Sequence, residues 1–235
     1  MKKKNKRDYF VSCIVAAGGS SRRLGDGMNK LFLEIDGVPV IARTLLSLEQ
    51  SQYIDEIIVS AREEDMLDIS DLAGAFGIRK LKTIVKGGAV RAASVKAALS
   101  SVSQGCDFVA VHDGARPLTD EDTIARVVSA AVLHGAAACG VRPKCTIKQE
   151  DKDGFIAQTV DRSKLYEMQT PQVFTKSLLC RAYDADEDRL RTVTDDCALV
   201  EQLGTKIKIT QGSYRNIKIT TPEDIAVAEG LLDEE

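Results

Sequence analysis

The chain has 235 residues, of which 44% are hydrophobic and 29% are charged, and its formal net charge is −3. This length can bury a substantial core, and the composition is ordinary for a globular protein. The small negative charge gives no electrostatic reason to expect nucleic acid or an anionic membrane as a partner. The six cysteines form no Cys-x-x-Cys pair, which predicts free thiols in a reducing compartment and a cytoplasmic location.

The first eight residues carry a basic cluster, and we expect residues 1–8 to form a disordered, solvated tail. From residue 9 on, short apolar runs alternate with segments of helical periodicity. The strand candidates are Tyr9–Val15, Glu56–Ser60, Lys82–Val85, Phe108–His112, Ala136–Val141 and Lys206–Thr210. The helix candidates are Val40–Gln50, Glu63–Phe76, Arg91–Ser101, Asp120–His134 and Thr194–Leu203. This alternation predicts a doubly wound, Rossmann-like α/β sandwich of three layers with a mostly parallel sheet, in a single domain over residues 9–235.

One region interrupts the alternation. The short strand-like runs Thr146–Lys148 and Phe155–Val160 flank a polar segment that ends in Asp153-Gly154, a hairpin signal. We therefore expect an inserted β-hairpin arm at about residues 142–170. Arms with edge strands often pair with another subunit, so the arm also predicts a homodimer.

A glycine-rich loop follows the first strand candidate. Small residues at Ala16–Gly19 let backbone N–H groups approach an anion closely, and Arg22, Arg23 and Lys30 add positive charge. The loop lacks both the dinucleotide-binding Gly-x-Gly-x-x-Gly order and the P-loop signature. It predicts a polyphosphate site, and the alternative is a flexible turn with solvated basic residues.

A carboxylate stands at the end of the strand candidate Phe108–His112. Ligands bind at strand ends in doubly wound sheets, and Asp113 beside phosphates would suit Mg²⁺, which prefers oxygen ligands. Arg116 could then bind a second anion. The alternative is an Asp-Gly turn with a salt bridge between these two residues. His112 is expected to be packed or turn-forming rather than catalytic.

A further turn leads from a strand candidate into a helix candidate at Lys86–Ser94. Glycines at a helix start let a base or a phosphate approach backbone N–H groups. A simple helix cap explains the turn equally well.

Together these motifs resemble the 2-C-methyl-D-erythritol 4-phosphate cytidylyltransferase family, from about Val11 to Leu232. The runs that carry the resemblance are the loop Ala16–Gly25, Asn29-Lys30-Leu31-Phe32, Gly87-Gly88-Ala89-Val90-Arg91-Ala92-Ala93-Ser94, His112-Asp113-Gly114-Ala115-Arg116-Pro117, Val160-Asp161-Arg162, Gln169-Thr170-Pro171-Gln172 and Asn216-Ile217-Lys218-Ile219-Thr220. The resemblance implies a Mg²⁺-dependent homodimer that joins CTP to 2-C-methyl-D-erythritol 4-phosphate and releases pyrophosphate.

The resemblance also implies roles for individual residues. The catalytic cations are Arg23, Lys30 and Lys218. The nucleotide-binding residues are Ala16, Ala17, Gly18, Gly19, Gly88, Arg91 and Ser94. The acceptor-binding residues are Asp113, Arg116, Thr146, Arg162 and Thr170, and Asp113 also holds the metal.

Some positions depart from the family pattern. Ser21 stands in place of a glycine, Ala89 and Val90 in place of a polar pair, and Cys145 in place of an aspartate. These departures support the alternative of a non-catalytic nucleotide-binding regulator with the same fold. A second alternative is a ribitol-5-phosphate cytidylyltransferase. The run Val160-Asp161-Arg162 favours the erythritol phosphate as acceptor, because the ribitol enzymes have a run that resembles Asn-Arg at this position.

Overall fold

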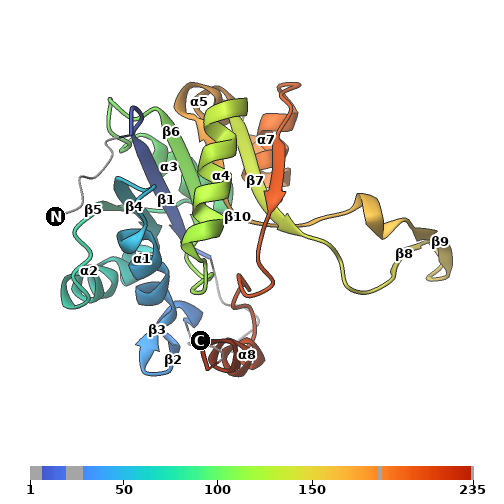
Figure 1. Cartoon of the computed structure of the whole chain (residues 1–235), viewed down its shortest axis with the longest axis horizontal. Helices are drawn as coiled ribbons and strands as arrows, with labels where there is room; N and C mark the ends of the chain where they lie inside the picture. The colour runs from blue at the N-terminus through green and yellow to red at the C-terminus, as the bar shows by residue number, and fades with distance from the viewer. Residues whose placement is uncertain (1–6, 20–28, 185–186, 234–235) are drawn as a thin grey trace.

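The computed structural model describes residues 7–19, 29–184 and 187–233, and a seven-stranded sheet runs through its centre (Figure 1). The strand order is β11-β7-β10-β6-β1-β4-β5. The strands are β1 (Val11–Ala17), β4 (Glu56–Ala61), β5 (Leu81–Lys86), β6 (Phe108–Asp113), β7 (Ala136–Val141), β10 (Glu167–Thr175) and β11 (Lys208–Gln211). All neighbours pair in parallel except β10, which is antiparallel to both β6 and β7. The predicted mostly parallel sheet is confirmed.

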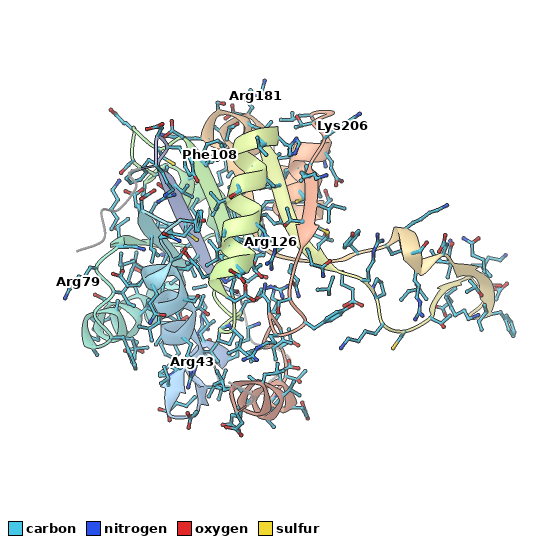
Figure 2. All side chains as sticks on the ribbon, viewed as in Figure 1. Arg43, Arg79, Phe108, Arg126, Arg181 and Lys206 are labelled. Carbon is cyan, nitrogen blue, oxygen red and sulfur yellow. The ribbon has the colours of Figure 1, made fainter. Side chains whose placement is uncertain are left out.

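Helices cover both faces of the sheet. One face packs against α1 (Val40–Gln50), α2 (Met66–Ala75), α4 (Glu121–His134) and α8 (Glu223–Leu232). The other face packs against α3 (Arg91–Leu99), α5 (Lys176–Tyr183), α6 (Glu187–Thr192) and α7 (Asp196–Glu201). Every residue of β4 and β7 is buried, as expected for strands that are covered on both sides. Exposed basic side chains such as Arg79, Arg181 and Lys206 lie at the periphery (Figure 2).

Two of the predicted helices begin with an aspartate cap. The Asp120 carboxylate accepts a hydrogen bond from the backbone N–H of Thr123 and caps α4. The Asp195 carboxylate accepts one from the backbone N–H of Ala198, at 2.9 Å, and caps α7. Both aspartates satisfy an N–H group that has no partner inside its helix. The predicted helix Glu63–Phe76 is instead a 3₁₀ turn, η2 (Glu63–Asp65), followed by α2.

The central antiparallel strand β10 was not anticipated from the sequence. The register of its pairing with β7 shifts between Met168 and Gln172. Pro171 therefore lies where the regular backbone hydrogen bonding to β7 is interrupted. Gln169, Thr170 and Gln172 are polar and yet buried, which conceals the strand from a search for apolar runs. The sequence also gave no indication of α5, α6 or the small hairpin of β2 (Glu34–Ile35) and β3 (Val38–Pro39).

The predicted hairpin is present as β8 (Ile147–Glu150) and β9 (Ile156–Val160), which pair antiparallel and project from the body (Figure 1). Nearly all of its residues are exposed, including Phe155 and Ile156. Contact of this hairpin with a second subunit stays a prediction. Over the residues that the structure describes, no helix is both long and apolar enough to cross a bilayer.

Candidate active site

A cavity of about 220 Å³ opens at the carboxyl edge of the sheet, where β1 and β6 end side by side with Ala16 opposite Asp113. Parallel strands present this edge to ligands. Most of the residues predicted for the nucleotide and for catalysis line it. The lining is Ala16, Ala17, Gly18, Gly19, Lys30, Leu31, Arg91, Ser94, Asp113, Ala115 and Lys218. Residues from five separate parts of the chain therefore meet at one cavity.

The turn before α3 is bonded to the helix, whose Arg91 and Ser94 line this cavity. The backbone N–H of Gly88 donates to the Ser94 hydroxyl at 3.1 Å, although Gly88 itself does not line the cavity. A Cβ atom on Gly87 would lie 2.8 Å from the Ser94 oxygen, so only glycine fits there. Val90 gives no side-chain cap to the helix. The glycines thus allow close approach between the turn and the helix.

Three cations surround the Asp113 carboxylate. Lys218 Nζ lies 2.8 Å from Oδ2, Arg91 Nε lies 3.1 Å from Oδ1, and Arg116 Nε lies 3.5 Å from Oδ2. Burial alone would raise the pKa of Asp113, but these positive charges outweigh it and hold the pKa well below its usual range. The salt bridge between Asp113 and Arg116, which was the alternative to a ligand site, is present. It forms part of a larger charged cluster.

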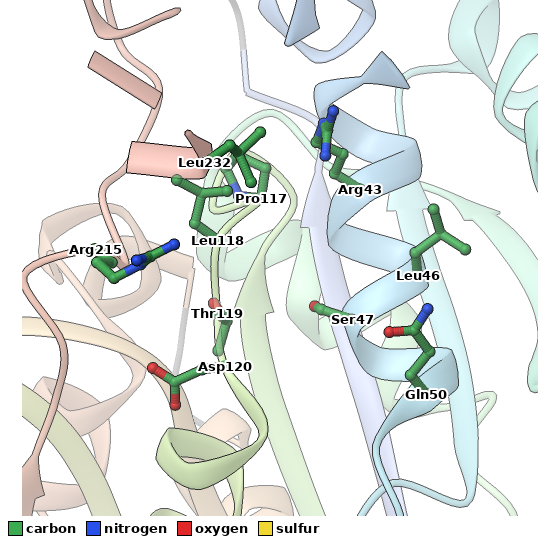
Figure 3. Close-up of a pocket in the computed structure, with 10 residues that line it drawn as sticks. All are labelled: Arg43, Leu46, Ser47, Gln50, Pro117, Leu118, Thr119, Asp120, Arg215 and Leu232. Carbon is green, nitrogen blue, oxygen red and sulfur yellow. The ribbon is translucent and has the colours of Figure 1, made fainter. Parts of the chain in front are cut away.

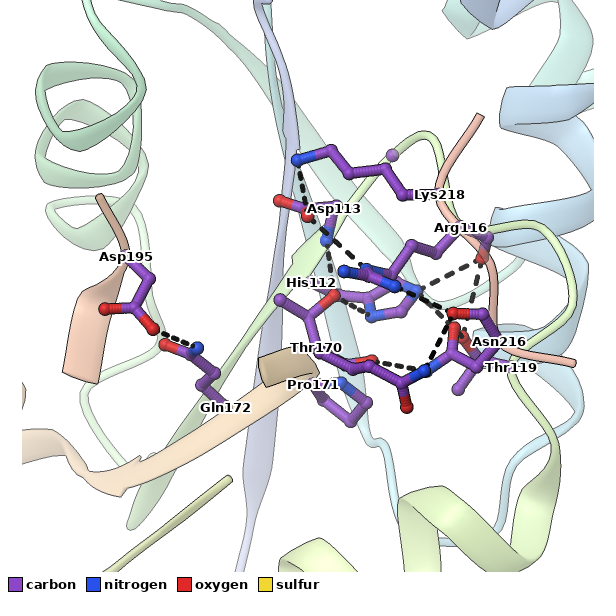
Figure 4. A network of polar contacts seen from close by, with 12 residues as sticks. His112, Asp113, Arg116, Thr119, Thr170, Pro171, Gln172, Asp195, Asn216 and Lys218 are labelled. Atoms are coloured by element: carbon purple, nitrogen blue, oxygen red, sulfur yellow. Dashed lines mark hydrogen bonds and ion pairs between the residues drawn. The ribbon is translucent and has the colours of Figure 1, made fainter. Parts of the chain in front are cut away.

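A buried network of hydrogen bonds lies beneath the charged cluster and is joined to it through Arg116 (Figure 4). The His112 ring contacts the Thr170 hydroxyl at 3.0 Å and the Thr119 hydroxyl at 3.3 Å. Arg116 donates to the Asn216 carbonyl at 2.7 Å, and the Asn216 amide donates to the Thr170 carbonyl at 2.9 Å. Burial lowers the pKa of His112 to about 4, so the ring is neutral at pH 7. His112 is packed, as expected, and holds its neighbours in place.

Lys218 lines two further cavities beside the first. One, of about 420 Å³, is also lined by Arg116, Lys144, Cys145 and Tyr214. The other, of about 120 Å³, brings Asp113, Arg116 and Thr170 together. The acceptor-binding residues predicted in the body of the chain therefore lie next to the nucleotide cavity, with Lys218 at the junction.

The predicted residues of the arm are placed elsewhere. Thr146 and Arg162 are exposed, and the Arg162 guanidinium donates to the Lys144 carbonyl of its own chain. Neither residue lines the cavities at the carboxyl edge of the sheet. Arg23 and Ser21 lie outside the described residues, so the structure does not place the loop end.

A separate pocket of about 260 Å³ lies between α1 and the segment that precedes α4 (Figure 3). Arg43, Ser47, Asp120 and Arg215 give it a polar lining. It holds none of the residues predicted for nucleotide, acceptor or metal. The predicted site residues in the body of the chain gather instead at the cavities along the carboxyl edge of the sheet.

Two neighbouring aspartates lie at the start of α7 and have different partners. Asp195 is the cap, whereas the Asp196 carboxylate is fully buried and lies 2.7 Å from Arg91. Tyr183 donates a hydrogen bond to the same carboxylate. No local pattern could reveal this contact, because Arg91 and Asp196 are 105 residues apart.

Comparison with known proteins shows which family the chain resembles. The family model of 2-C-methyl-D-erythritol 4-phosphate cytidylyltransferase matches residues 11–234. The enzyme of that name from Caldanaerobacter subterraneus subsp. tengcongensis is 43% identical over 223 residues, covering 94% of this chain and 98% of its own. That from Bacillus mycoides is 42% identical, covering 95% and 98%. The solved structure of 4-diphosphocytidyl-2C-methyl-D-erythritol synthase from Anaerococcus prevotii matches with a TM-score of 0.83 and 31% identity over 96% of each chain.

Proposed function

The chain belongs to the 2-C-methyl-D-erythritol 4-phosphate cytidylyltransferase family and transfers the cytidylyl group of CTP to that acceptor, and we propose that the transfer takes place in the cavity between β1, α3 and β6. One observation carries this placement. Lys30, Arg91 and Lys218 converge with Asp113 around a single cavity whose floor is made of small residues. Such a cavity suits the triphosphate of a nucleotide.

In the proposed reaction, an oxygen of the acceptor phosphate attacks the α-phosphorus of CTP in line, and the bond to pyrophosphate breaks. The acceptor phosphate is already ionised at neutral pH, so no general base is needed. Catalysis then consists of positioning two anions that repel each other and of neutralising the charge that develops. Lys30 and Lys218, with Arg23, supply that positive charge. Lys218 contacts both cavities and can therefore act on both substrates.

The chemistry of Asp113 fits Mg²⁺. Its carboxylate is ionised and lines the nucleotide cavity, and it is the acidic residue in that lining. In the described residues no group of three or more His, Cys, Asp or Glu side chains is suited to hold a metal. Mg²⁺ commonly binds through one or two carboxylates together with substrate phosphates. Asp113 would hold the ion with CTP, and the ion would neutralise phosphate charge.

We further propose that residues 9–235 act as one domain and that the arm at 142–170 forms a homodimer in which Thr146 and Arg162 serve the site of the partner subunit. The exposed Phe155 and Ile156 on the hairpin support a contact of this kind. The base of the arm is held to the body, since Lys144 Nζ lies 4.2 Å from the centre of the Tyr214 ring. The six free cysteines support a cytoplasmic location.

Mixed dimers test the role of the arm. A Lys30→Ala subunit and an Arg162→Ala subunit are each expected to be weak alone. If the arm serves the partner, a co-expressed mixture contains hybrid dimers with one intact site, so activity should return to about a quarter of the wild-type level. No recovery in such hybrids, isolated by two affinity tags, would contradict service across the dimer.

The function itself is tested by pyrophosphate release. The full chain with CTP and Mg²⁺ should release pyrophosphate with 2-C-methyl-D-erythritol 4-phosphate and not with ribitol 5-phosphate. Faster release with the ribitol phosphate would favour that enzyme. Binding of CTP without release in either case would favour a nucleotide-binding regulator.

A further inference from the structure

A second buried carboxylate lies behind the nucleotide cavity. Asp196, the first residue of α7, is 0% exposed and does not line the cavity. One of its oxygens lies 2.7 Å from Arg91 NH1, and the other accepts a hydrogen bond from the Tyr183 hydroxyl. Both oxygens of the carboxylate are therefore occupied by donors from two other helices, α3 and α5.

A buried carboxylate is costly unless a cation and hydrogen-bond donors compensate it, and Arg91 and Tyr183 supply both. Although burial alone would lower the pKa of Arg91, the charges of Asp196 and Asp113 outweigh it and raise that pKa. Burial and the neighbouring Asp196 charge raise the pKa of Tyr183, so its hydroxyl stays a donor.

Arg91 is shared between two acids. Its Nε lies 3.1 Å from Asp113 and its NH1 lies 2.7 Å from Asp196, so one guanidinium nitrogen faces each carboxylate. An arginine without the second acid could turn two nitrogens toward Asp113 and form a bidentate pair, the geometry that arginine and carboxylate favour. That pair would withdraw Arg91 from the cavity wall and occupy the carboxylate that faces the nucleotide.

We propose that Asp196, held by Tyr183, is a positioning residue that fixes Arg91 in its CTP-binding orientation and keeps Asp113 available to the nucleotide. The proposal rests on the proposed role of Arg91 in the nucleotide cavity. Asp196 acts through Arg91 and touches neither substrate. Its loss changes the binding of CTP, while the cavity beside Arg116 and Tyr214 keeps its walls.

The test compares CTP affinity, measured by calorimetry on the full chain, in a double-mutant cycle of Asp196→Asn and Arg91→Gln. Asparagine keeps the shape and removes the charge. Asp196→Asn should weaken CTP binding about 10- to 100-fold, as expected for loss of a charged hydrogen bond. In the Arg91→Gln background the same change should alter CTP affinity by less than about twofold, because Asp196 acts through Arg91 and that side chain is absent.

A matched control separates positioning from general destabilisation. Glu56 is also buried, at 6% exposure, and also binds hydroxyl donors and a cation, namely Ser12, Ser103 and Lys82. It begins β4, at the edge of the sheet opposite the cavity. Glu56→Gln should lower the melting temperature as Asp196→Asn does and leave CTP affinity unchanged. Equal losses of CTP affinity from Asp196→Asn in both backgrounds would overturn the proposal.

Tyr183→Phe decides the outcome if Asp196→Asn does not fold. It removes one hydroxyl and should weaken CTP binding in the same direction, with the KM for the acceptor unchanged. Wild-type affinity in Tyr183→Phe would then overturn the proposal. Failure of the proposed function is seen separately: either the wild-type chain binds CTP without transferring it, or Arg91→Gln alone binds CTP normally.

Discussion

Lys30→Ala should lower turnover by about two to three orders of magnitude, the usual cost of removing one transition-state contact of this kind. Lys30 lines the nucleotide cavity and begins the 3₁₀ turn η1 (Lys30–Phe32). The turn is fixed by Asn29, whose side chain accepts from the backbone N–H of Leu31, and by the buried Leu31 side chain. These anchors do not involve the ammonium group. Steady-state kinetics with both substrates saturating measure the effect.

The fold of Lys30→Ala should be intact, which circular dichroism and the melting temperature check. Lys208→Ala is the matched control, because Lys208 is an exposed lysine on the edge strand β11. It should react at the wild-type rate. An unchanged rate in Lys30→Ala would contradict the assignment of the cavity as the active site.

Asp113→Asn is expected to have a comparable effect for a different reason. The amide keeps the size of the side chain but removes the negative charge shared by Arg91, Arg116 and Lys218. It also removes the carboxylate proposed for Mg²⁺. Turnover should fall by about two to three orders of magnitude, and the Mg²⁺ concentration for half-maximal activity should rise. A titration of turnover against Mg²⁺ measures both changes.

Asp107→Asn serves as the control on the same strand. Asp107 immediately precedes β6 at its opposite end and accepts from the backbone N–H of Phe10 at 2.8 Å. Its loss should leave the Mg²⁺ dependence as it is. If Asp113→Asn loses turnover but keeps the wild-type Mg²⁺ dependence, Asp113 is an organiser of the cations and not the metal ligand.

Local sequence predicts the parallel part of the fold well. Runs such as Phe108–His112 and Ala136–Val141 are continuously apolar because both faces of these strands are covered, and the structure places β6 and β7 there. The antiparallel strand β10 was not predicted, because its buried residues include the polar side chains Gln169, Thr170 and Gln172. Their side chains are satisfied by tertiary partners, which no local pattern displays.

In the candidate site, too, local motifs were predictable and tertiary contacts were not. A strand-end motif predicted Asp113 as a site residue and the family resemblance implied Arg91, and the structure brings both to one cavity. The second partner of Arg91 could not be predicted, since Asp196 meets it only after α3 and α7 pack on the same face of the sheet. The role proposed for Arg162 requires a second subunit, which one sequence cannot position.

The charged cluster also determines when, during synthesis of the chain, its contacts can be completed. Arg116 is paired with Asn216, which lies 100 residues later, and Lys218 follows two residues after that. At about 5–20 residues per second, a ribosome needs roughly 5–20 s to add that length. Throughout that interval Asp113 lacks its contact with Lys218 and Arg116 lacks its contact with Asn216, although Arg91 is already synthesised. The cavity proposed as the active site is therefore among the last parts of the nascent protein to be completed.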